Sequence, residues 1–135
     1  MFRELDERTL VSGQIAPHEV AALAEQGLTI IVNNRPDGEE PGQPLASEIE
    51  EAAAQAGLAY RFVPIIRGIG PADIEEMQKA WRQAEGGKLL AFCRSGTRSA
   101  FAMALAKREA GATVEEVSEC LTSAGFDPSP IAHLL

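Results

Sequence analysis

The residues best suited to chemistry in this sequence are a cysteine and an arginine that lie five positions apart, Cys93 and Arg98. They belong to the stretch 92–99, which reads Phe-Cys-Arg-Ser-Gly-Thr-Arg-Ser. An apolar run precedes this stretch and a helix-forming run follows it, so we expect a strand, a tight loop and a helix. The backbone amides of such a loop, and of the first helical turn, have no partners within the helix and form an anion site.

Cys93 falls at the end of the expected strand, at the focus of these amides. The amides and the two nearby arginines, Arg94 and Arg98, favour the thiolate, which is the nucleophilic form of cysteine. Gly96 allows a backbone conformation that other residues resist, and Ser99 is a candidate donor of a hydrogen bond to the sulfur. The alternative is that Cys93 is a small buried core residue. We favour a nucleophilic role for Cys93, because the strand, the glycine, the arginines, the serine and the helix around it all fit one mechanism.

The expected anion site is built mainly from the residues that follow the cysteine: Arg94, Ser95, Gly96, Thr97 and Arg98. The loop 33–42 follows another expected strand, at the sheet edge where open α/β sheets bind ligands. Arg35 is therefore a further candidate, and Arg67 is another from the loop after the next strand. For both arginines the alternative is an ordinary surface or turn residue.

Two carboxylates are candidates for a general acid, Asp37 and Asp73. Asp37 lies in the loop 33–42, where local hydrogen bonds in a solvated turn explain it equally well. Asp73 lies in the first turn of an expected helix, where the helix dipole alone favours a carboxylate.

Strands and helices alternate along the chain. Apolar and β-branched runs predict strands, and helical spacing with glycine or proline at the ends predicts helices. The expected strands cover residues 9–12, 28–32, 58–65 and 88–92, and the expected helices cover 17–26, 45–56, 71–85, 100–110 and 113–124. This order predicts an α/β fold with a small, mainly parallel sheet of about four strands and helices on both faces.

Composition narrows the class of protein. The 135 residues suit one domain, 1–135, and the net charge of −8 argues against a nucleic-acid partner.

No apolar segment is long enough to span a membrane, and the charged N-terminus lacks a signal-peptide core, so we expect a cytoplasmic protein. The cysteines, Cys93 and Cys120, lie in different settings, which argues against a disulfide. No cluster has metal-ligand spacing, and we expect neither metal nor cofactor.

The loop 93–99 resembles the active loop of single-domain rhodaneses. In those proteins the cysteine carries a persulfide, and an arginine follows it at the same spacing as Arg98. The segment upstream of the loop lacks the pattern that usually accompanies it in rhodaneses.

A longer resemblance covers nearly the whole chain. The segments 11–14 (Val-Ser-Gly-Gln), 31–37 (Ile-Val-Asn-Asn-Arg-Pro-Asp) and 60–65 (Tyr-Arg-Phe-Val-Pro-Ile) occur in order before the cysteine loop. Together they look like the phosphatase-like domain of β-lactamase-hydrolase-like proteins, a dual-specificity-phosphatase-like family. This resemblance implies a protein-tyrosine-phosphatase-like fold. It also implies a partner, because related domains are fused to a metallo-β-lactamase-type hydrolase of sulfur metabolism.

Two departures from the phosphatase pattern bear on the reaction. A phosphatase loop has five residues between cysteine and arginine, whereas only four separate Cys93 from Arg98. The general acid of phosphatases is usually an aspartate near positions 66–67, where this chain has Ile66 and Arg67. A phosphate ester needs that proton for its leaving group, and losing a general acid costs about 10²–10⁴-fold in rate.

We therefore expect a sulfurtransferase that carries a persulfide on Cys93. It would move sulfur from thiosulfate or a small persulfide to an acceptor thiol or cyanide. The alternatives are a cysteine-dependent phosphatase that forms a phosphocysteine on Cys93, and a non-catalytic module that binds anions. In each case the ligand is a small anion, a sulfur compound or a phosphate.

Overall fold

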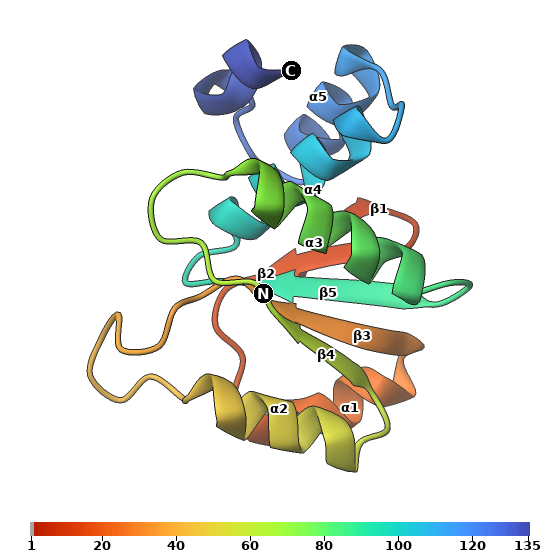
Figure 1. Ribbon diagram of the computed structural model, residues 1–135. Coiled ribbons are helices and arrows are strands. Elements are labelled where there is room, and N and C mark those ends of the chain that lie inside the picture. Colours follow the sequence, from red (N-terminus) through yellow and green to blue (C-terminus); the bar gives the residue numbers. More distant parts are fainter. Residues whose placement is uncertain (1) are drawn as a thin grey trace.

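A computed structural model describes residues 2–135 and contains one five-stranded sheet in the order β1-β2-β5-β3-β4 (Figure 1). Only β1 runs antiparallel to its neighbour, β2; the other pairs are parallel. The strands are β1 (Phe2–Asp6), β2 (Thr9–Ser12), β3 (Leu28–Asn33), β4 (Ala59–Phe62) and β5 (Lys88–Phe92). The predicted α/β class with a mainly parallel sheet is confirmed.

The sheet has one strand more than expected, and the additional strand is β1. Most of β1 is exposed and only Leu5 is buried, because β1 lies at the edge of the sheet and pairs with β2 alone. An edge strand needs no continuous apolar run and is often charged. Its sequence, Phe-Arg-Glu-Leu-Asp, therefore lacks the apolar pattern that identified the inner strands.

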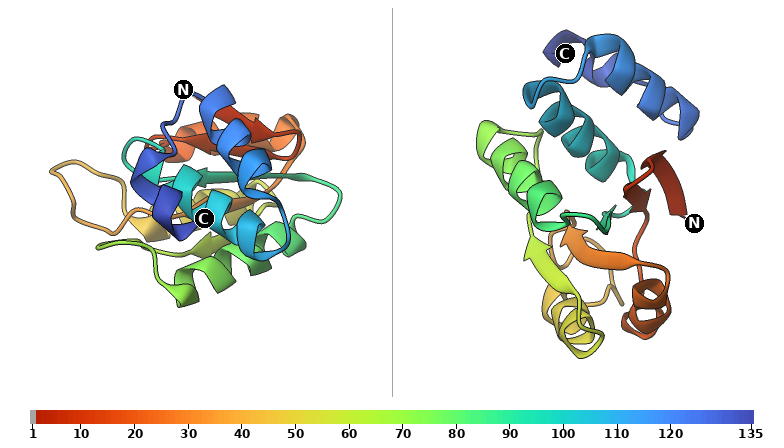
Figure 2. Two further views of the ribbon diagram at one scale, coloured as in Figure 1. Left: turned by 90° about the horizontal axis from the view of Figure 1, so that it is seen from above. Right: turned by 90° about the vertical axis from the view of Figure 1, so that its right-hand side faces the viewer.

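Helices cover both faces of the sheet (Figure 2). One face carries η1 (Pro17–Glu19), α1 (Val20–Glu25) and α2 (Ala46–Gln55), and the other carries α3 (Pro71–Gln83), α4 (Thr97–Glu109), α5 (Val114–Ser123) and η2 (Ser129–Leu134). Successive side chains of β3 alternate between the two cores: Ile30 packs on the side of α3 and α4, and Ile31 packs on the side of α1 and α2. The middle of β3 and of β5 is a continuous apolar run because both faces of these strands are buried there.

The carboxyl ends of the four parallel strands meet at one edge of the sheet, at the left in Figure 1. There Phe92 of β5 lies in register with Ser12 of β2 and with Asn33 of β3, which pairs in turn with Phe62 of β4. The loops after these strands are brought together here, as the sequence predicted from the rule for open α/β sheets.

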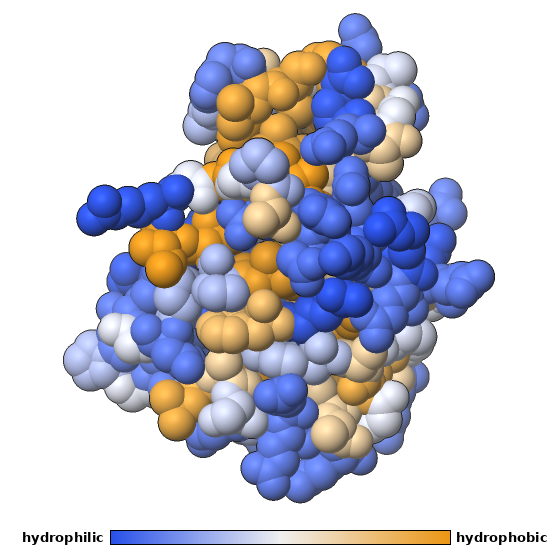
Figure 3. Space-filling view, viewed as in Figure 1, coloured by the Kyte–Doolittle hydropathy of each residue, from blue (hydrophilic) through white to orange (hydrophobic). Residues whose placement is uncertain are grey.

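The surface is mixed in character. In the view of Figure 3, hydrophilic residues cover much of the molecule and apolar residues gather toward the C-terminal segment. Within residues 2–135 no helix is both long and apolar enough to cross a membrane, and the cytoplasmic location stays a prediction.

We predict that Leu90→Ala lowers the free energy of unfolding by about 2–5 kcal/mol, because Leu90 is fully buried in the core beneath α1 and α2. Urea denaturation checks this value. The matched control, Leu134→Ala, removes an exposed side chain and is expected to change stability by about 0.5 kcal/mol or less. Similar losses for the two variants would contradict the assignment of the core.

Candidate active site

Cys93 lies where the sequence placed it, directly after β5 and before α4. Its side chain is completely buried, and its backbone N–H donates to the carbonyl of Ser12 at 3.3 Å. The sulfur accepts a hydrogen bond from the backbone N–H of Gly96 at 3.1 Å. Because α4 begins at Thr97, the sulfur also faces the positive end of a helix of 13 residues. The expected strand, loop and helix are present.

Two glycines shape the loop. Gly96 adopts a φ of +98°, in the left-handed region that side chains disfavour. Gly13, on the segment after β2, lies so close to the loop that a Cβ there would be 2.8 Å from the carbonyl oxygen of Arg94. The segment after β2 therefore packs directly against the cysteine loop, a contact that its sequence did not indicate.

Ser99 does not donate to the sulfur, and that expectation is wrong. Its hydroxyl donates to the side-chain oxygen of Asn34 at 2.8 Å. Asn34 is fully buried, so its polar atoms need partners within the protein. Its side-chain nitrogen donates to the carbonyl of Val63 at 2.9 Å, and its backbone N–H donates to the carbonyl of Phe92 at 2.8 Å. Asn34 thus joins the ends of β3, β4 and β5 to the start of α4.

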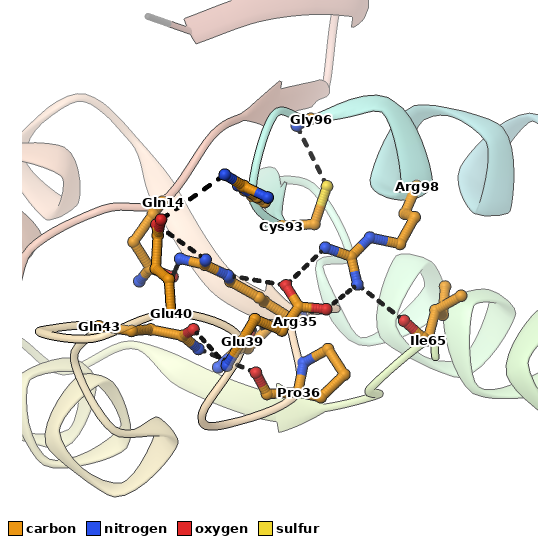
Figure 4. A network of polar contacts seen from close by, with 12 residues as sticks. Gln14, Arg35, Pro36, Glu39, Glu40, Gln43, Ile65, Cys93, Gly96 and Arg98 are labelled. Carbon is orange, nitrogen blue, oxygen red and sulfur yellow. Dashed lines mark hydrogen bonds and ion pairs between the residues drawn. The ribbon is translucent and has the colours of Figure 1, made fainter. Parts of the chain in front are cut away.

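Arg98 extends from the first turn of α4 across the carboxyl ends of the strands (Figure 4). Its guanidinium donates to the carbonyl of Ile65 at 2.8 Å and to both carboxylate oxygens of Glu39, each at 2.8 Å. The hydrogen bonds to Glu39, together with the nearby charge of Cys93, raise the pKa of Arg98 above its usual value.

Arg35 is buried and already has a partner for each of its guanidinium nitrogens. It donates to Glu39 at 2.9 Å, to Glu40 at 2.9 Å and to the side chain of Gln14 at 3.1 Å. In the structure Arg35 positions two acidic side chains of its own loop, and its direct contact with an anion stays a prediction.

Glu39 is the residue of this site that the sequence analysis missed. Its carboxylate bridges Arg98 and Arg35. The hydrogen bonds from Arg98 first, and then those from Arg35, lower the pKa of Glu39 to about 2. Its signal in the sequence is a pair of glutamates in a loop at the ligand-binding edge of the sheet, in a site expected to hold several arginines.

The other loop residues lie at the rim. Arg94 is exposed, and its guanidinium is 3.6 Å from the carboxylate of Glu40. The hydroxyl of Ser95 donates to that of Thr97 at 3.3 Å, and both residues are exposed.

The remaining candidates are not brought to the cysteine by any contact within residues 2–135. Arg67 is exposed and has no ion pair in that part of the chain. Asp37 accepts a hydrogen bond from the backbone N–H of Ala46, at the start of α2, at 2.7 Å. Asp73 accepts one from Gly70, at the start of α3, at 2.9 Å. Both carboxylates thus stabilise helix ends, and the role of general acid stays a prediction for each.

The chemistry that this arrangement supports is nucleophilic attack on an anion. A buried cysteine sulfur receives an amide hydrogen bond, and an arginine that can bind two oxygens at once lies in the next helical turn. Within residues 2–135 no group of three His, Cys, Asp or Glu side chains could hold a metal ion.

Comparison with protein families gives one match, described as the phosphatase-like domain of beta-lactamase hydrolase-like protein, over residues 1–111. A Xylella fastidiosa protein named beta-lactamase hydrolase-like protein is 42% identical over 126 residues, which is 92% of this chain and 29% of that protein. The chain therefore spans less than a third of the length of the curated relatives that it matches.

Solved structures give the same class. A candidate phosphatase from Neisseria meningitidis is 28% identical, with a TM-score of 0.77 over 98% of this chain and 94% of that one. The active form of Tk-PTP matches with a TM-score of 0.72 at 21% identity, over 93% of this chain and 86% of that one, which shows a shared fold.

These comparisons overturn the expectation of a sulfurtransferase. The matched family is phosphatase-like, and neither a persulfide nor a sulfur-transfer function is supported. The expectation rested on the number of residues between Cys93 and Arg98 and on the absence of an aspartate near positions 66–67, and the family match overrides both. The guanidinium of Arg98 donates to Ile65 and Glu39, which are 33 and 59 positions away in the sequence, so residues outside the loop fix where its charge lies.

We predict that Ser99→Ala destabilises the protein by about 1–3 kcal/mol, because it leaves the buried side-chain oxygen of Asn34 without a donor. Thermal or urea denaturation measures the change. Ser95→Ala is the matched control, since Ser95 is exposed, and its effect is expected to be about 0.5 kcal/mol or less. A Ser99→Ala variant as stable as the wild type would contradict the role given to Asn34.

We also predict that Glu39 contributes to the free energy of unfolding at neutral pH and that this contribution is lost in acid. Its pKa in the folded protein is about 2, below its ordinary 4.5. A lowered pKa contributes stability that is complete above pH about 4.5 and is lost as the pH falls through about 2. The difference in unfolding free energy between wild type and Glu39→Gln is expected to be about 1–2 kcal/mol at neutral pH, after allowance for solvent screening.

Urea denaturation at several pH values checks this prediction, and the difference between the two proteins should shrink below pH about 4.5. Glu51→Gln, which changes an exposed glutamate of α2, is the control and is expected to show no such trend. A difference that stays constant down to pH about 2 would contradict the assigned ion pair.

Proposed function

Because this chain belongs to the family of phosphatase-like domains of beta-lactamase hydrolase-like proteins, we propose that it is a cysteine-dependent phosphatase. The observation that carries the proposal is the setting of Cys93. The sulfur is buried at the end of β5, accepts a hydrogen bond from Gly96 and faces the start of α4, with Arg98 in the first helical turn. A phosphoryl group needs such a combination of nucleophile, amides and fork-shaped cation.

The reaction proceeds in two steps. The Cys93 thiolate attacks the phosphorus of a phosphate monoester, so that a sulfur–phosphorus bond forms while the bond to the leaving oxygen breaks. Water then attacks the phosphocysteine, which releases inorganic phosphate and restores the thiolate. Arg98 and the loop amides bind the phosphoryl oxygens and stabilise the charge that they carry in both transition states.

The class of substrate follows from the leaving group. Neither Asp37 nor Asp73 contacts the cysteine loop within residues 2–135, and Glu39 and Glu40 are paired with arginines. An alkoxide leaving group needs a proton from such a residue, whereas a phenolate is far more stable as an anion. The site therefore favours aryl phosphates over alkyl phosphates.

A protein partner is also proposed. The curated relatives that match are more than three times as long as the matched segment. We infer from the fused relatives of this family that the domain works beside a metallo-β-lactamase-type hydrolase.

The test is release of phosphate from an aryl phosphate such as 4-nitrophenyl phosphate. Turnover is expected for the wild type and for Cys120→Ser, to be lost in Cys93→Ser, and to fall by about 10²–10³-fold in Arg98→Ala. Orthovanadate is expected to inhibit it. Turnover no faster in the wild type than in Cys93→Ser would contradict the proposal and leave the non-catalytic anion-binding alternative.

A further inference from the structure

The guanidinium that should bind a phosphoryl group is already occupied by a carboxylate of the same chain. Glu39 meets Arg98 through two parallel hydrogen bonds of 2.8 Å, one to each carboxylate oxygen (Figure 4). This fork-to-fork geometry is the one in which an arginine binds two oxygens of a phosphate. The carboxylate of Glu39 thus takes the positions that two phosphoryl oxygens would take.

Three of the five N–H groups of Arg98 are used within residues 2–135, two on Nη1 and one on Nη2, which leaves one on Nη2 and the one on Nε. Nη1 of Arg98 donates both to Glu39 and to the carbonyl of Ile65, each at 2.8 Å. A phosphoryl group that binds Arg98 through both terminal nitrogens must therefore displace Glu39.

Glu39 is held at Arg98 from behind by a second cation. Arg35, which is buried, donates to Glu39 at 2.9 Å and is itself fixed by Glu40 and Gln14. With a pKa of about 2, the carboxylate keeps its charge at neutral pH.

Displacement of Glu39 from Arg98 is nevertheless expected to cost the folded protein little stability. The side chain is 27% exposed, and the stretch 37–42 is exposed throughout. Rotation of the carboxylate away from Arg98 breaks two hydrogen bonds and disturbs no core contact, and the contact with Arg35 can persist.

We propose that Glu39 is an internal competitor for the anion site, a carboxylate that occupies both terminal nitrogens of Arg98 in the free protein and must leave before a phosphoryl group binds through them. That the ligand is a phosphoryl group rests on the proposed phosphatase function. The apparent affinity for that ligand is the intrinsic affinity reduced by the fraction of molecules in which Arg98 is free. For a partly exposed, two-bond ion pair that fraction is about a tenth, so removal of Glu39 strengthens binding by about 10-fold.

The experiment compares wild type, Glu39→Gln, Glu39→Ala and Glu51→Gln. Glu51→Gln is the matched control, because it removes the same charge from an exposed position on α2. Binding of tungstate, a tetrahedral dianion that is not turned over, is measured by titration calorimetry, and circular dichroism verifies that each variant is folded. Hydrolysis of 4-nitrophenyl phosphate is measured in parallel.

The expected result is that both Glu39 variants bind tungstate about 10-fold more tightly than the wild type and Glu51→Gln, with a matching fall in KM. Equal tungstate affinity in all four proteins would overturn the proposal, as would the absence of binding in all four. A fall in kcat of about 10²–10⁴-fold in Glu39→Gln, with unchanged tungstate binding, would overturn it in favour of a general acid.

Tungstate binding and substrate turnover distinguish the competitor role of Glu39 from the phosphatase activity. If Glu39→Gln binds tungstate more tightly while no protein turns over substrate, the competitor stands and the phosphatase proposal fails. If the wild type turns over substrate and the Glu39 variants bind tungstate no better, the phosphatase proposal stands and the competitor fails.

Discussion

The buried amide of Asn34 is the interaction on which the candidate site depends. Its side chain donates to Val63 and accepts from Ser99, and its backbone donates to Phe92. Asn34 follows β3, and these partners lie at the ends of β4 and β5 and in the first turn of α4. Because a buried amide without partners costs free energy, the strand ends and the helix are held in one relative position. Cys93 lies between two of these anchored segments, so its place is set by the core and not by its loop alone.

The charged side chains of the candidate site form ion pairs with one another. The protein carries a net charge of −8, yet Arg35, Arg94 and Arg98 gather at one edge of the sheet. In the structure Glu39 and Glu40 form ion pairs with these three arginines, so two of the three positive charges are compensated. A ligand competes with carboxylates that the chain itself supplies. The affinity of the site is then set by the difference between two ion pairs, which is smaller than either one.

The position of the Arg98 charge is not fixed by the length of the active loop. The four-residue spacing between Cys93 and Arg98 resembles that of rhodaneses, but the surrounding fold and the family are phosphatase-like. A loop length constrains backbone atoms, whereas the charge of an arginine lies several bonds away. Here that charge is directed by Ile65 and Glu39, which approach from the loops after β4 and β3.

The sequence alone determined the fold class, the order of the inner strands and helices, and the position of Cys93 between a strand and a helix, because these follow from periodicity, caps and glycines that act over a few residues. It did not reveal the edge strand β1, whose exposed residues carry no apolar pattern. Only the tertiary structure decided that Ser99 donates a hydrogen bond to Asn34. It also decided that the carboxylate of Glu39 accepts hydrogen bonds from both Arg35 and Arg98. Those partners are set by which side chains meet across strands that are distant in the sequence, and a polar residue in a loop carries no local sign of the partner that it will find.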